Sequence, residues 1–114
     1  MNQTIEQYSL YWVDLNPTKG AEINKSRPCV VISPLEMNEH LRTVMIAPVT
    51  SRGRGRGREG YPTRVRLTVG DVDGWIVLDK IRTIDKTWLC EKIGVLEAAA
   101  ILNVKCTIKE MLVE

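Results

Sequence analysis

The chain has 114 residues, the length of one ordinary domain, and its shares of hydrophobic (44%) and charged (26%) residues are typical of a globular protein. Its longest apolar run, Ala98 to Leu102, is far too short to span a bilayer, and its first residues form no secretory signal. We therefore expect a single cytoplasmic domain over residues 1–114, with no membrane partner.

The net charge of +2 is unevenly distributed, because arginine and glycine alternate in the stretch SRGRGRGREGYP, residues 51–62. Four of the 16 basic residues lie between Arg52 and Arg58, which leaves 12 basic against 14 acidic residues elsewhere. The excess positive charge is thus concentrated in this arginine–glycine arm, residues 51–62, which predicts contact with a polyanion.

Five strands are expected in chain order, each rich in β-branched or aromatic residues and bounded by turn residues. Their ranges are Tyr8 to Leu15, Arg27 to Ser33, Thr43 to Ser51, Thr63 to Val69, and Gly74 to Ile81. Pro48 indicates a bulge or an edge in the third strand. Strict alternation in the fourth predicts one apolar face and one polar face.

Helical spacing appears at the end of the chain, where apolar residues recur every three or four positions from Leu96 onward. No Ser, Thr, Asp or Asn is available to cap the start of this helix. A second, short helical turn is expected within PLEMNEH, residues 34–40. Five short strands and one C-terminal helix predict a mainly β fold, a small antiparallel barrel with the helix packed on it.

The arginine–glycine arm and the loop from Asn16 to Ser26 are long for a small barrel, and such loops often carry function. Alternate residues of an extended chain lie about 7 Å apart on one side, a spacing comparable to that of neighbouring phosphates in a single strand. The arm is thus suited to bind RNA through Ser51, Arg52, Arg54, Arg56 and Arg58. The alternative is a flexible connector that binds nothing.

The cysteines and the histidine do not indicate catalysis or a metal site. Cys29, Cys90 and Cys106 are far apart and form no CxxC pair, and His40 is the only histidine. We expect Cys29 to be buried, Cys106 to lie on a helix and His40 to be at the surface. No metal and no cofactor is expected.

Four stretches, in this order, resemble the MazF/PemK family of toxin endoribonucleases. They are DLNPTKGAE (residues 14–22), Arg27-Pro28 before a Val/Ile strand, APVTS (residues 47–51) and DKIRTID (residues 79–85). The resemblance implies an SH3-like barrel that forms a homodimer and cuts single-stranded RNA at short sequences. It also implies a partner antitoxin whose flexible acidic tail occupies the RNA groove.

By the same resemblance, Arg27 and Thr50 take part in cleavage and Glu22 assists. Attack by the substrate's own 2′-hydroxyl on the adjacent phosphate needs no metal and leaves a 2′,3′-cyclic phosphate and a 5′-hydroxyl. Arg27 is suited to stabilise the charge that gathers on the phosphate oxygens, but not to act as a base, since a guanidinium group keeps its proton in proteins. Which of Glu22 and Arg27 transfers a proton stays open.

Other readings of these residues remain. Arg27 could only begin a strand and pair with Asp79, and Thr50 could be an ordinary strand residue. Lys19, Asp79 and Arg82 are expected to bind RNA, although the last two could instead form a structural pair. The aromatic residues Tyr61, Trp12, Trp75 and Trp88 could stack on bases, but for Trp12 and Trp75 core packing is favoured.

The sequence departs from the family pattern at Tyr8 and Ser9, where glycine and an acid are usual, at Ala21 and Ile23 in the first loop, and at Lys80. These departures bear on RNA sequence preference and on activity. The alternative function is a barrel that binds RNA or an acidic peptide without cutting.

Overall fold

The computed structural model describes residues 4–15, 26–50 and 63–113. Its strands are β1 (Ser9–Asp14), β2 (Ser26–Val31), β3 (Thr43–Thr50), β4 (Arg64–Val69), β5 (Val72–Val77), β6 (Arg82–Asp85) and β7 (Leu89–Val95). Helix α1 spans Leu35–His40 and helix α2 spans Ala98–Ile108, and α2 continues into one wider π-helical stretch, Lys109–Val113. Short 3₁₀ turns at Leu78–Lys80 and Lys86–Trp88 flank β6.

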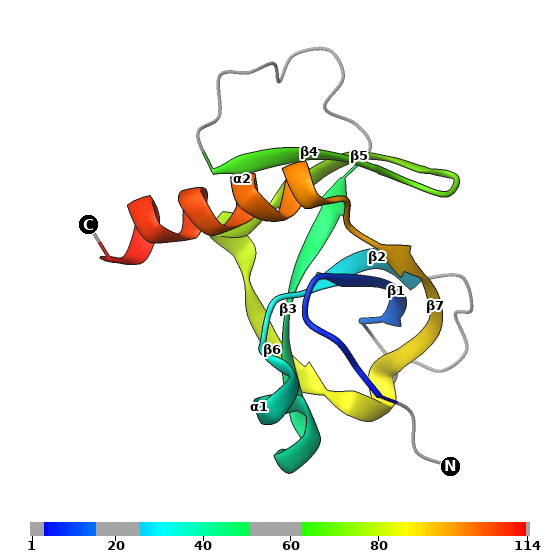
Figure 1. Cartoon of the computed structure of the whole chain (residues 1–114). Helices are drawn as coiled ribbons and strands as arrows, with labels where there is room; N and C mark the ends of the chain where they lie inside the picture. The colour runs from blue at the N-terminus through cyan, green and yellow to red at the C-terminus, as the bar shows by residue number, and fades with distance from the viewer. Residues whose placement is uncertain (1–3, 16–25, 51–62, 114) are drawn as a thin grey trace.

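The strands form one antiparallel sheet in the order β4-β5-β3-β2-β1-β7, and β6 pairs with β3 beside this path. The sheet bends strongly, so that β1, β2 and β7 curl around one end while the β4–β5 hairpin crosses the other (Figure 1). Helix α2 lies along the β4–β5 hairpin, and α1 lies at the far end of β3 (Figure 1). The expected small antiparallel barrel with a C-terminal helix is therefore confirmed.

Strand β3 organises the sheet by changing partners along one edge. Its first half pairs with β6 from Thr43 to Ile46, and its last two residues pair with β5. Pro48, which has no N–H to donate, falls between these two segments and faces Cys29 of β2. Of the predicted bulge or edge at Pro48, the edge is thus wrong, because β3 is a central strand and the proline lies where its partner changes from β6 to β5.

The second half of β2 and much of β3 bury residues on both faces, which explains their unbroken apolar runs. One face packs against the β4–β5 hairpin and α2, in a core whose fully or nearly fully buried residues include Leu10, Val30, Ala47, Ile76 and Val104. The opposite face closes over β6, with Tyr11, Val13, Cys29, Val31, Val44, Ile46 and Ile84. Alternate residues of one strand therefore enter different cores.

The helix predictions hold. Helix α2 starts after Glu97, whose side chain makes no capping hydrogen bond, as the lack of a capping residue predicted. Cys106 lies on α2 and Cys29 is fully buried, while His40 is exposed on α1. Helix α1 is held by buried Asn38, whose amide donates to the carbonyls of Ile5 (2.8 Å) and Ser33 (3.0 Å).

The strands differ from the sequence prediction in the end of the fifth strand and in two further strands. The fifth strand ends at Val77, because the chain turns through Leu78–Lys80, and β6 and β7 were not predicted. Strand β6 has only four residues, and β7 shows no regular alternation of buried and exposed residues. Neither strand therefore carries the pattern on which a sequence prediction depends.

Two backbone features shape the start of β1 and its neighbour β7. Tyr8 has φ +69, a left-handed conformation that is uncommon for any residue but glycine, at a position where the sequence departs from the family's usual glycine. Gly94 on β7 lies so close to β4 that a Cβ atom there would be 2.7 Å from Cγ1 of Val69. Within the described residues, no helix is long and apolar enough to cross a membrane.

Candidate functional site

A pocket of about 600 Å³ opens where the ends of four strands meet. Its lining residues come from the end of β1, the start of β2, the end of β3 and the β4–β5 turn: Trp12, Ser26, Arg27, Pro28, Val49, Thr50, Asp71, Val72 and Asp73. The described lining residues supply one cation, two carboxylates, two hydroxyls and an aromatic ring. This composition suits a ligand with both charged and flat parts.

The register of β2 and β3 explains why Arg27 and Thr50 meet. The residue numbers of each pair, such as Cys29 with Pro48 and Val30 with Ala47, add to 77. Arg27 and Thr50 lie two residues beyond the last pair of this register, Arg27 near the start of β2 and Thr50 at the end of β3. Both residues line the pocket, and neither is buried in the core, since Arg27 is exposed and Thr50 half-buried.

The positive charge of Arg27 extends inward to Cys29, two residues along β2. Burial raises the pKa of the Cys29 thiol to about 12, although the guanidinium groups of Arg27 and Arg82 act in the opposite direction. The thiol donates weakly to the carbonyl of Arg27 at 3.7 Å. Cys29 is thus a neutral, structural residue beneath the site, as expected from its sequence context.

The β4–β5 hairpin supplies the acidic wall of the pocket. Asp73 accepts hydrogen bonds from Arg66 (2.6 Å) and Thr68 (3.1 Å), and these hold the pKa of its carboxyl below the ordinary value of 3.8. The guanidinium of Arg66 also lies 5.5 Å from the ring centre of Trp75. These contacts tie the two strands together and fix the direction of the hairpin.

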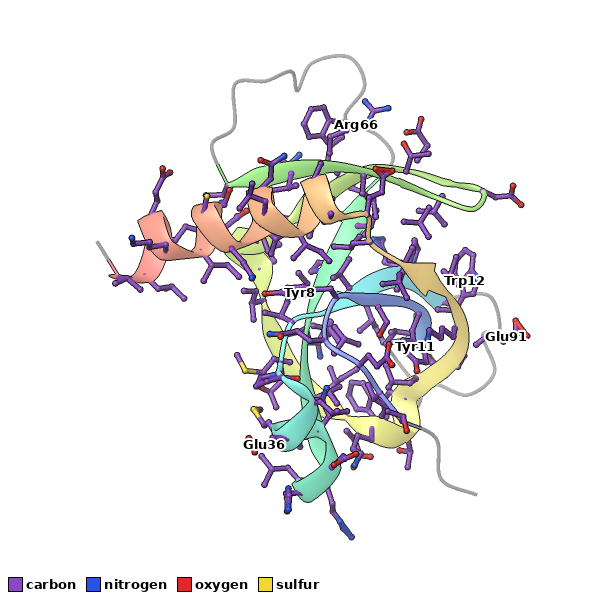
Figure 2. All side chains as sticks on the ribbon, in the orientation of Figure 1. Tyr8, Tyr11, Trp12, Glu36, Arg66 and Glu91 are labelled. Carbon is purple, nitrogen blue, oxygen red and sulfur yellow. The ribbon has the colours of Figure 1, made fainter. Side chains whose placement is uncertain are left out.

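Trp12 and Trp75 correct the sequence prediction of core packing. The side chain of Trp12 is 37% exposed at the pocket, and Figure 2 shows it projecting away from the core at β1. Trp75 is half-buried on the outer face of the hairpin beneath Arg66. Both lie in strands that alternate between faces, so an apolar neighbourhood in sequence did not mean an interior position.

Asp79 and Arg82 do not line the pocket. Asp79 accepts a hydrogen bond from the hydroxyl of Thr63 at 2.9 Å, and the guanidinium of Arg82 lies 5.8 Å from the ring centre of Trp88. No ion pair joins Asp79 to Arg82 or to Arg27 in the described part of the chain. The alternative of a structural Asp79–Arg82 pair, and that of an Arg27–Asp79 pair, therefore do not hold.

The remaining predicted site residues lie outside the described residues. They are Lys19, Glu22, Ser51, Arg52, Arg54, Arg56 and Arg58, together with Tyr61. Among the residues that are described, no three His, Cys, Asp or Glu side chains gather as a metal site would require.

Asp71, Val72 and Ser26 are pocket residues that the sequence analysis did not single out. Gly70 and Asp71 form the two-residue turn of the β4–β5 hairpin, with Val69 paired to Val72, and Gly70 has φ +59. The Gly-Asp pair between two alternating stretches is a hairpin signal that could have been recognised. This signal predicts the turn, but it does not predict that the turn lies at the same pocket as Arg27.

Comparison with known proteins gives the family. A family model described as "PemK-like, MazF-like toxin of type II toxin-antitoxin system" matches residues 6–112. The chain is 33% identical over 104 residues to the endoribonuclease MazF of Staphylococcus epidermidis, covering 88% of this chain and 84% of that protein. It is 36% identical over 75 residues to the endoribonuclease toxin MazF of Escherichia coli K12, a match that spans 66% of this chain and 63% of the relative, less than two thirds of its length.

The fold agrees with a solved structure as well. The crystal structure of MazF from Deinococcus radiodurans superposes with a TM-score of 0.76 at 26% identity, covering 97% of this chain and 98% of that one.

Proposed function

The chain belongs to the PemK-like, MazF-like toxin family of type II toxin–antitoxin systems, and we propose that it is a toxin of this kind. In this proposal it is an endoribonuclease that cuts single-stranded RNA at short sequences, without a metal ion. Residues 1–114 act as one domain in the cytoplasm. A cognate antitoxin with an acidic tail is its inhibitor, and a homodimer is its working form.

The observation that carries the proposal is the meeting of Arg27 and Thr50 in one pocket. The two come from different strands, and each is accessible to a ligand. An exposed guanidinium beside a hydroxyl is a suitable arrangement for holding a phosphate, because both donate hydrogen bonds and one is charged.

The chemistry follows from these groups. The 2′-hydroxyl of the substrate attacks the neighbouring phosphorus, its proton passes to a base, and the bond to the 5′-oxygen of the next nucleotide breaks as that oxygen takes up a proton. Arg27 stabilises the negative charge on the non-bridging oxygens, which is greatest at the pentavalent stage. Thr50 donates a second hydrogen bond to the same phosphate.

Glu22 is proposed as the base, since it is the carboxylate that the family motif associates with activity. Ser51, Lys19 and the arginines of the arm bind the RNA backbone on either side of the cut. Asp79 and Arg82, which lie away from the pocket, are proposed to contact RNA only beyond the nucleotides that are cut.

The test is incubation of the purified protein with single-stranded RNA and EDTA, followed by analysis of the ends. We expect 2′,3′-cyclic phosphate and 5′-hydroxyl ends from RNA, and no cleavage of DNA of the same sequence. Arg27→Ala should reduce kcat/KM by about 10²–10³-fold, the usual loss on removing one donor to a developing anion. Lys105→Ala, on the exposed side of α2, is the matched control.

RNA that stays intact with EDTA, or an Arg27→Ala variant as active as the parent, would overturn the proposal. If the intact RNA is nevertheless bound, the chain is the non-catalytic binding module instead.

A further inference from the structure

The pocket has a second wall that phosphate binding does not explain. Besides Arg27 and Thr50, its lining includes Trp12 from β1 and Asp71 from the β4–β5 turn. A carboxylate repels a phosphate, so this wall must face another part of the ligand. The following inference rests on the proposed function only in assuming that RNA enters this pocket.

Trp12 is suited to stack on a base. A tryptophan with 37% of its surface exposed leaves a large apolar face in contact with water, and this face opens into a pocket of about 600 Å³. That volume lies in the range of small-molecule sites and is sufficient for one nucleotide. Base stacking on an aromatic side chain strengthens single-strand binding and accepts any base.

Asp71 is suited to read the edge of that base. Its neighbour Asp73 is already engaged by Arg66 and Thr68, whereas Asp71 is exposed at the tip of the hairpin, and no described residue forms a hydrogen bond or an ion pair with it. An ionised carboxylate accepts hydrogen bonds and donates none. It therefore selects a base edge that carries donors.

Guanine is the base that fits such an acceptor. Its Watson–Crick edge carries N1–H and the 2-amino group side by side, so both carboxylate oxygens can accept at once. Adenine, cytosine and uracil each carry one donor group beside an acceptor on this edge, which the carboxylate would repel. We propose that the pocket binds a guanine next to the cut, stacked on Trp12 and recognised by Asp71.

The test uses uridine pentamers whose 2′-hydroxyls are methylated, so that they cannot be cut, with guanine, inosine, adenine or cytosine at the centre. Inosine lacks only the 2-amino group. The parent protein should bind the guanine pentamer about tenfold more tightly than the inosine pentamer, since a hydrogen bond to a charged group is lost. Asp71→Asn should reduce this ratio to within about twofold.

Trp12→Ala should weaken binding of all four pentamers by about tenfold or more and keep the guanine-to-inosine ratio, whereas Trp12→Phe should retain most of the affinity. Glu91→Gln, an exposed carboxylate on β7 outside the pocket, is the matched control and should change nothing. Equal binding of guanine and inosine by the parent, or an undiminished ratio in Asp71→Asn, would overturn the inference.

Cleavage of a random RNA pool by the same proteins separates the two proposals. If no RNA is cut while the guanine preference depends on Asp71, the proposed endonuclease activity is contradicted and the proposed guanine recognition is supported. If RNA is cut with no guanine preference, or with one that Asp71→Asn leaves intact, the proposed endonuclease activity is supported and the proposed guanine recognition is contradicted.

Discussion

Arg27, near the start of β2, and Thr50, at the end of β3, border the same pocket. In the proposed nuclease the hydroxyl at position 50 donates to the phosphate that Arg27 also holds. Thr50→Val keeps the shape of the side chain and its β preference but removes the donor, so kcat/KM should fall by about ten- to a hundredfold, while Thr50→Ser should stay within a few-fold of the parent.

The measurement is RNA cleavage with EDTA, accompanied by thermal unfolding to show that neither variant has lost its fold. Should the valine variant cut as fast as the serine variant, the hydroxyl has no part in the reaction.

Contacts between the arginine–glycine arm and RNA phosphates would make the RNA-binding constant depend more steeply on salt concentration. If Arg52, Arg54, Arg56 and Arg58 each neutralise a phosphate, changing all four to serine should flatten the slope of log K against log salt by about 3, at roughly 0.7 per contact for single strands. The slope is obtained by measuring the binding constant for a non-cleavable RNA at salt concentrations from about 50 to about 200 mM.

Lys105→Ser with Lys109→Ser removes two exposed positive charges at the C-terminal end of the chain and serves as the control, with a slope close to that of the parent. An arm variant whose slope equals that of the parent would make the arm a connector.

At position 8 we expect a glycine variant to be more stable than an alanine variant, the reverse of the usual order. A residue with φ +69 is strained unless it is glycine, and Tyr8 also forms backbone bonds to Val31 (2.7 Å) and Leu96 (3.0 Å) that hold it there. Both Tyr8→Ala and Tyr8→Gly lose the packing of the ring, but only glycine relieves the strain. The glycine variant should therefore be more stable than the alanine variant by about 1 kcal/mol.

Urea unfolding measures this difference. Glu91, exposed in β7 with an ordinary backbone, provides the comparison, since there the alanine variant should be the more stable of the two. The same order at both positions would show that the left-handed conformation at Tyr8 costs nothing.

Gly94 and Val69 should be energetically coupled. A Cβ at position 94 would meet Cγ1 of Val69 at 2.7 Å, so Gly94→Ala should destabilise the fold by about 1–3 kcal/mol. Val69→Ala removes the obstructing methyl groups, and in its presence the same glycine substitution should cost much less. A double-mutant cycle from denaturant unfolding gives the coupling energy, and additive effects would contradict the close approach of β4 and β7.

Much of the fold was predictable because its strands carry local patterns. A short stretch of sequence is enough to recognise the alternation from Arg64 to Val69, the β-branched runs of β2 and β3, and the helical spacing of α2. Strands β6 and β7 carry no such pattern, since the first is short and the second mixes buried and exposed residues without order. Trp12 was misjudged because the composition around it does not reveal which face it occupies.

By itself the sequence determined five of the seven described strands, both helices, the basic arm and, through its resemblance to a family, the pair Arg27 and Thr50. Only the tertiary structure decided that these two share a pocket with Trp12 and Asp71, and that Asp79 and Arg82 lie elsewhere. The reason is physical: a strand's periodicity depends on its own neighbours in the chain, whereas register, partner and the direction of a hairpin depend on contacts between segments far apart in sequence.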